Sequence, residues 1–113
     1  GSLSDGMGHG NNAEAMQREI RGFMAAVECA VAYAAEHDDT LVVVTADHET
    51  GGLGLVSGNA DFNLSEQGVE YRWCTTGHSA QMVPVYLYGT GAELINGIME
   101  NSELGAKLKQ LLK

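Results

Sequence analysis

A chain of 113 residues is long enough for one small domain, and its 44% hydrophobic residues supply a modest core. Six basic residues against fifteen acidic ones give a formal net charge of −9, which argues against nucleic acid and anionic membrane surfaces as partners and favours metal cations. No apolar run reaches the length of a membrane-spanning helix, so no membrane insertion is expected.

The first ten residues are predicted to form a glycine-rich loop. Asp5 and His9 stand four positions apart in it, a spacing that would place both on one face of a helix. The glycines at positions 6, 8 and 10 argue against a regular helix. They favour a tight, exposed turn whose backbone comes close to something bound.

A long helix is predicted over residues 12–36. Asn11 is the expected N-cap and Glu14 stands three residues later, as in a capping box. Apolar residues then recur with the helical period and form a wide stripe. Cys29 falls inside this helix, so it is interpreted as a small buried residue rather than as half of a disulfide with Cys74.

Residues 41–46 are six apolar or β-branched residues without alternation. Such a run is typical of a strand buried on both faces in a parallel sheet that helices cover. It ends in Asp47 and His48, an oxygen ligand and an imidazole at a strand's carboxyl end, where ligands bind in open α/β sheets. A helix, a turn and a buried strand in succession predict half of an α/β repeat.

The remaining predicted elements are short. In chain order they are a peripheral hairpin excursion over about 53–75 with strands at 53–56 and 69–73, a polar loop at 75–79, a strand at 83–88 with Pro84 at its start or edge, and a terminal helix at 102–112.

Five residues combine into a candidate metal-ligand set: Asp5, His9, Asp47, His48 and His78. Imidazoles with carboxylates form a zinc-type set, and mixed sites with an open position are typical of catalysis. Taken singly, each pair is more often a cap or turn device, so only the combination indicates metal. His37, without a similar neighbour, is interpreted as a helix-end residue that interacts with the helix dipole.

Three stretches together resemble the C-terminal half of alkaline phosphatases. They are Asp-Gly-Met-Gly-His-Gly-Asn-Asn at 5–12, Thr-Ala-Asp-His-Glu-Thr-Gly-Gly-Leu at 45–53, and Thr-Gly-His-Ser-Ala-Gln-Met-Val-Pro-Val-Tyr-Leu-Tyr-Gly at 76–89. The resemblance implies that residues 1–113 form part of a three-layer α/β/α sandwich with a central, mostly parallel sheet. It also implies that Asp5, His9 and His78 bind one zinc ion, and that Asp47 and His48 bind a second.

The resemblance implies a metal-dependent enzyme that hydrolyses phosphate monoesters at a two-zinc site, with magnesium nearby. In that chemistry one zinc activates a serine that becomes phosphorylated, and the other activates the water that hydrolyses the phosphoserine. The chain shows no counterpart of that serine motif, of the phosphate-binding arginine or of the magnesium ligands, one of which is a glutamate expected directly before Gly1. We therefore expect a C-terminal fragment that is inactive alone.

The expected fragment lacks neighbouring strands of the sheet. An orphaned sheet edge and uncovered helix faces predict a homodimer or larger assembly. By the resemblance, the intact enzyme is periplasmic or extracellular. Two alternatives stay open. One is a related phosphodiesterase, sulfatase or phosphoglycerate mutase, and the other is a stand-alone metal-binding or interaction module that kept the ligands and lost the chemistry.

Overall fold

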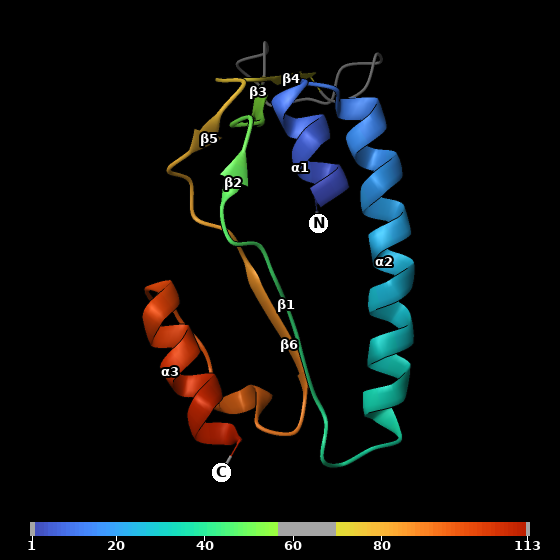
Figure 1. Ribbon diagram of the computed structural model, residues 1–113, viewed down its shortest axis with the longest axis vertical. Coiled ribbons are helices and arrows are strands. Elements are labelled where there is room, and N and C mark those ends of the chain that lie inside the picture. The colour runs from blue at the N-terminus through green and yellow to red at the C-terminus, as the bar shows by residue number, and fades with distance from the viewer. Residues whose placement is uncertain (1, 57–69, 113) are drawn as a thin grey trace, which may run out of the picture. The chain divides into compact units, whose positions relative to one another are not determined.

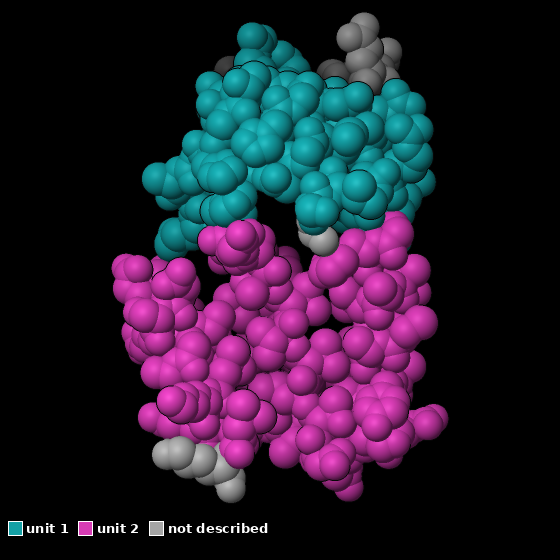
Figure 2. Space-filling model, viewed as in Figure 1, with its two compact units in different colours: residues 1–21, 48–82 teal, residues 22–47, 83–113 magenta. Residues whose placement is uncertain are grey.

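The computed structural model describes residues 2–56 and 70–112 (Figure 1). In chain order the elements are α1 (Ser2–His9), α2 (Ala13–Ala35), β1 (Leu41–Thr45), β2 (Glu49–Thr50), β3 (Gly54–Val56), β4 (Glu70–Arg72), β5 (His78–Ser79), β6 (Val85–Gly89), the 3-10 helix η1 (Ala92–Leu94) and α3 (Asn101–Leu111). The chain divides into two compact units, coloured separately in Figure 2: Gly1–Arg21 with His48–Met82, and Gly22–Asp47 with Val83–Lys113.

The segment predicted as a loop at the start of the chain is the helix α1. A helix of eight residues that contains Gly6 and Gly8 is marginal in isolation, since each glycine costs about 1 kcal/mol relative to alanine. Tertiary contacts outweigh this cost. Gly8 is buried, and a Cβ there would lie only 3.0 Å from the Thr50 carbonyl oxygen and 3.1 Å from Met16 Cε. The missing side chain therefore allows α1 to lie directly against β2.

A Schellman motif ends α1. Asn11 adopts the left-handed conformation (φ 49°), and the N–H of Asn12 donates to the Met7 carbonyl oxygen at 3.0 Å. Asn12 then caps α2, because its Oδ1 accepts a hydrogen bond from the Ala15 N–H at 3.0 Å. The predicted N-cap, Asn11, was therefore wrong by one residue, since that asparagine takes the left-handed position instead.

The helix α2 agrees with the predicted boundaries to within one residue at each end. Ala15 and Ala34 are buried, whereas the exposed fractions of Phe23 and Met24 are 47% and 54%. Cys29 is also exposed, so its predicted burial was wrong, and both cysteines are free thiols. Much of the predicted apolar stripe thus remains accessible to solvent among the described residues.

The strand β1 pairs antiparallel with β6, from Leu41 opposite Gly89 to Thr45 opposite Val85. It is only half-buried, whereas burial on both faces was predicted. All strand pairs among the described residues are antiparallel, so the mostly parallel central sheet stays a prediction. Pro84 directly precedes β6, as predicted, and its carbonyl oxygen accepts a hydrogen bond from Thr45 Oγ1 at 3.1 Å.

Two further antiparallel pairs, β2 with β5 and β3 with β4, lie in the first unit. The β3–β4 pair confirms the predicted hairpin, whose connection 57–69 lies outside the described residues. The two-residue strand β5 replaces a predicted loop because it pairs with β2. The terminal helix α3 is confirmed within one residue. Across residues 2–56 and 70–112, no helix has the length and apolarity needed to cross a membrane.

Candidate metal centre

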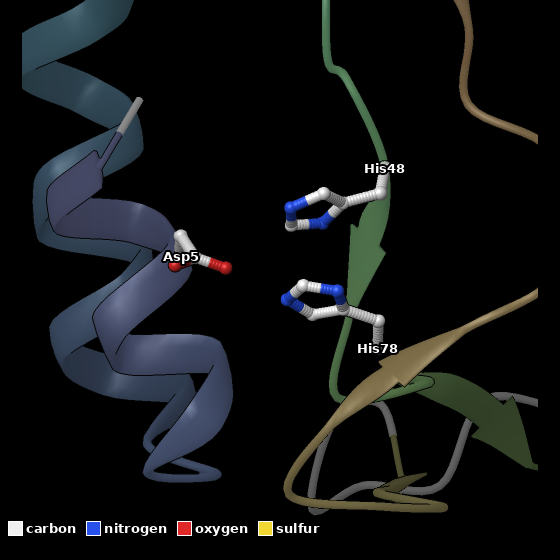
Figure 3. Close-up of side chains that lie close together, drawn as sticks. All are labelled: Asp5, His48 and His78. Atoms are coloured by element: carbon white, nitrogen blue, oxygen red, sulfur yellow. The ribbon is translucent and has the colours of Figure 1, made fainter.

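Three of the five predicted ligands converge in the first unit. The Asp5 carboxylate and one imidazole nitrogen each of His48 and His78 all lie within 4.8 Å of one another. In Figure 3 the carboxylate points from α1 toward the two imidazoles, of which His48 directly precedes β2 and His78 belongs to β5. Three segments that are far apart along the chain therefore supply one group of metal-type donors.

The register of the β2–β5 pair explains why the two imidazoles meet. Thr50 lies directly opposite His78, and His48 precedes Thr50 by two residues. Side chains two positions apart on an extended chain point to the same side, so His48 and His78 become diagonal neighbours on one face. Their rings stack with centroids 3.6 Å apart and planes inclined by 23°.

His9 borders this group from α1. Its Nε2 lies 3.5 Å from Asp5 Oδ1, one helical turn away, and its ring centroid is 5.1 Å from that of His78. Its Nδ1 lies 2.6 Å from the Thr76 carbonyl oxygen. Because a carbonyl only accepts, Nδ1 of His9 is the donor of this bond, and Nε2 is the ring nitrogen that faces Asp5.

The fifth predicted ligand, Asp47, is exposed and follows β1 in the second unit. Its role as a ligand of a second metal stays a prediction.

The Asp5 carboxyl is held in its ionised form. The hydrogen bond donated by the Thr50 hydroxyl is the main cause that lowers the pKa of Asp5, and His9, His48 and His78 act in the same direction whenever they are protonated. An ionised carboxylate beside imidazoles is the donor set that zinc takes in catalytic sites. The residues present therefore fit a zinc ion.

The sequence reasoning missed the polar residues around the ligands. Thr50 Oγ1 donates to Asp5 Oδ1 at 2.6 Å, and the Glu49 carboxylate accepts hydrogen bonds from the Gly52 N–H and from the Ser79 hydroxyl. A signal for Thr50 was present, since it stands two residues after His48 and so shares its side of an extended chain. For Glu49 no such signal existed, because its partner in β5 is set by a register that the sequence does not reveal.

Comparison with known proteins shows the family. The model of the family described as alkaline phosphatase matches residues 1–69, more than half of the chain. The chain belongs to the alkaline phosphatase family. It is 22% identical to Alkaline phosphatase 3 and to Alkaline phosphatase 4 of Bacillus subtilis (strain 168); these matches include 100% of the chain, and 39% and 38% of the two relatives.

Solved alkaline phosphatases share the fold. The enzyme from the Antarctic bacterium TAB5 is 39% identical, with a TM-score of 0.84 over 97% of this chain and 32% of that one. A mutant of the TAB5 enzyme with Mg bound in its M3 site is 38% identical, with a TM-score of 0.84 over 97% of this chain and 33% of that one. The α/β class is thereby confirmed, and the chain spans about a third of the length of these alkaline phosphatases.

Proposed function

We propose that this chain is the C-terminal part of a metal-dependent alkaline phosphatase whose intact form hydrolyses phosphate monoesters. The observation that carries the proposal is the convergence of Asp5, His48 and His78 in a chain of this family. The chain alone is expected to be inactive, because the nucleophilic serine and the phosphate-binding arginine of the resemblance have no counterpart in its sequence.

In the proposed enzyme, Asp5, His9 and His78 hold one zinc ion, and Asp47 with His48 contribute to a second, with magnesium bound elsewhere in the protein. Bound zinc supplies Lewis acidity toward phosphoryl oxygens. The one carboxylate of the group within 4.8 Å only partly offsets a divalent charge, since the neutral imidazoles add none. The site would therefore stay positive and attract a phosphate dianion despite the net charge of −9.

The proposed parent acts in the periplasm or outside the cell, as the resemblance implies. It takes phosphate monoesters, and the fold of the whole protein is a three-layer sandwich with a mostly parallel central sheet. The strand β1, half-buried here, is the element of this chain that would lie inside that sheet.

The test is an assay of the intact protein encoded by the gene that contains this chain. With zinc and magnesium present, it is expected to hydrolyse 4-nitrophenyl phosphate much faster than bis(4-nitrophenyl) phosphate. Asp5→Asn and His78→Ala should each lower the rate of monoester hydrolysis by at least about 100-fold. Loss of a residue that only hydrogen-bonds to a metal ligand already lowers activity by up to about 100-fold. The matched control is His37→Ala, because His37 stacks on Tyr33 at the end of α2 and belongs to no group of metal-type donors among the described residues.

Two results would contradict the proposal. Faster hydrolysis of the diester would indicate a phosphodiesterase of the same superfamily. No hydrolysis of either ester, with zinc still bound, would indicate a metal-binding module without phosphatase chemistry.

A further inference from the structure

Thr50 lies at the centre of the converging donors, although it is not a metal ligand. It is the second residue of β2, opposite His78 in β5, and it is half-buried. Its Oγ1 lies 2.6 Å from Asp5 Oδ1 and 3.3 Å from His48 Nδ1. A single hydroxyl therefore contacts two candidate metal ligands, Asp5 and His48, from different segments of the chain.

The hydrogen-bonding capacity of a hydroxyl fixes the direction of both bonds. A threonine hydroxyl has one proton and can also accept, whereas an ionised carboxylate only accepts. The proton must then lie on the short bond to Asp5, so Oγ1 is the acceptor toward His48. It follows that His48 Nδ1 carries a proton, so that the neutral form of the ring has its lone pair on Nε2.

The rest of the Thr50 side chain is held in place by α1. A Cβ at Gly8 would lie 3.1 Å from Thr50 Cγ2, so the threonine methyl group occupies the space that the glycine leaves open. A β-branched side chain has little freedom at χ1. Contact of the methyl group with α1 therefore keeps the hydroxyl directed at Asp5 and His48.

We propose that Thr50 is a positioning residue that joins Asp5 to His48 through one hydroxyl and thereby makes Nε2 of His48 the metal-ligating nitrogen. The zinc part of this inference rests on the proposed function. Under that function, Thr50 links a ligand of the first zinc to a ligand of the second. Partners of this kind typically contribute about 10- to 100-fold in metal affinity.

The first experiment needs no metal. Nitrogen-15 NMR of the histidine rings of the metal-free chain, about two pH units above the ordinary histidine pKa of ~6.5, reports which ring nitrogen is protonated. His48 is expected in the Nδ1–H form in the wild type and in Thr50→Ser, which keeps the hydroxyl. In Thr50→Val, which keeps the shape and loses the hydroxyl, a mixture of both forms is expected. An Nε2–H form of His48 in the wild type would overturn the inference.

The second experiment measures zinc affinity by titration calorimetry on the same three chains, with circular dichroism to show that each is folded. Thr50→Val should bind zinc about 10- to 100-fold more weakly, and Thr50→Ser should recover most of the loss. Equal affinities of Thr50→Val and the wild type would overturn the inference but leave the proposed metal centre intact. A wild type that binds no zinc would instead contradict the metal centre, while the NMR result would still decide the role of Thr50.

Discussion

At the scale of single residues, the candidate centre is shaped by where each histidine places its proton. His9 Nδ1 faces a backbone carbonyl and His48 Nδ1 faces the Thr50 hydroxyl, so each ring has a partner on the same side of the imidazole. When one ring nitrogen donates a hydrogen bond, the other ring nitrogen is the one that can ligate a metal. Both rings thus present Nε2 to the group around Asp5.

Gly51 is the residue on which the turn beside the site depends. Its φ is +94°, its N–H donates to the Gly77 carbonyl oxygen at 2.9 Å, and a Cβ there would lie 2.4 Å from the Trp73 ring. Both the backbone conformation and the space exclude a side chain.

Gly51→Ala is therefore predicted to lower the free energy of unfolding by at least about 1–3 kcal/mol, measured by urea denaturation. The matched control is Gly22→Ala, since a Cβ at Gly22 within α2 meets nothing within 4 Å. That change should raise stability by up to about 1 kcal/mol, because alanine is the better helix former. Equal effects of the two changes would contradict this account of the turn.

At the scale of elements, the short strand β5 depends on one carboxylate. Both oxygens of Glu49 lie 3.0 Å from the Gly52 nitrogen, and Oε2 also accepts a hydrogen bond from the Ser79 hydroxyl. Glu49 lies opposite Ser79 in the β2–β5 register, and Ser79 directly follows His78. The side chain of Glu49 thus fixes β5, and with it His78, against the turn after β2.

Glu49→Gln should destabilise the chain by about 1–2 kcal/mol, because hydrogen bonds to a charged group are the stronger kind. It should also weaken zinc binding, since His78 loses its support. The control Glu70→Gln changes an exposed carboxylate that pairs with Arg72 at 2.9 Å, and surface pairs are worth only about 0–1 kcal/mol. Urea denaturation and zinc titration measure the stability and the zinc affinity of both variants. A larger loss of either in Glu70→Gln than in Glu49→Gln would refute the role given to Glu49.

The elements also show what the sequence could and could not predict. The apolar periodicity of α2 and α3 and the apolar runs of β1 and β6 were sufficient to predict the positions of these elements, because such signals are local. The helix α1 was missed because glycine propensity opposes it, and its contacts with Thr50 and Thr76 lie far along the chain. The candidate ligands were predicted from residue type and spacing, and they stay candidates. The sequence does not reveal that His48 and His78 lie side by side, because this follows from the β2–β5 register.

At the scale of the whole molecule, the described residues leave a large apolar surface accessible. Their buried apolar side chains are only Ala15, Ala34 and Ile95, whereas Phe23, Met24 and Tyr33 of α2 are about half exposed. Large apolar side chains left exposed in this number are typical of a surface that another chain covers.

We therefore predict that a second copy of the chain covers α2 and that light scattering at high concentration gives the mass of a dimer or larger assembly. Phe23→Glu should shift the chain toward the monomer, because it places a charge on the apolar surface. Arg21→Glu is a control that changes charge without removing apolar area. A wild type that stays monomeric at high concentration would refute this prediction.

Zinc titration of the metal-free chain decides whether Asp5 of α1, His78 of β5 and the residues around β2 form a metal centre. The account predicts about one zinc ion per chain, loss of binding in Asp5→Asn and His78→Ala, and unchanged binding in His37→Ala. Well under one zinc ion per chain at saturation, or binding that His37→Ala abolishes as completely as Asp5→Asn, would contradict it.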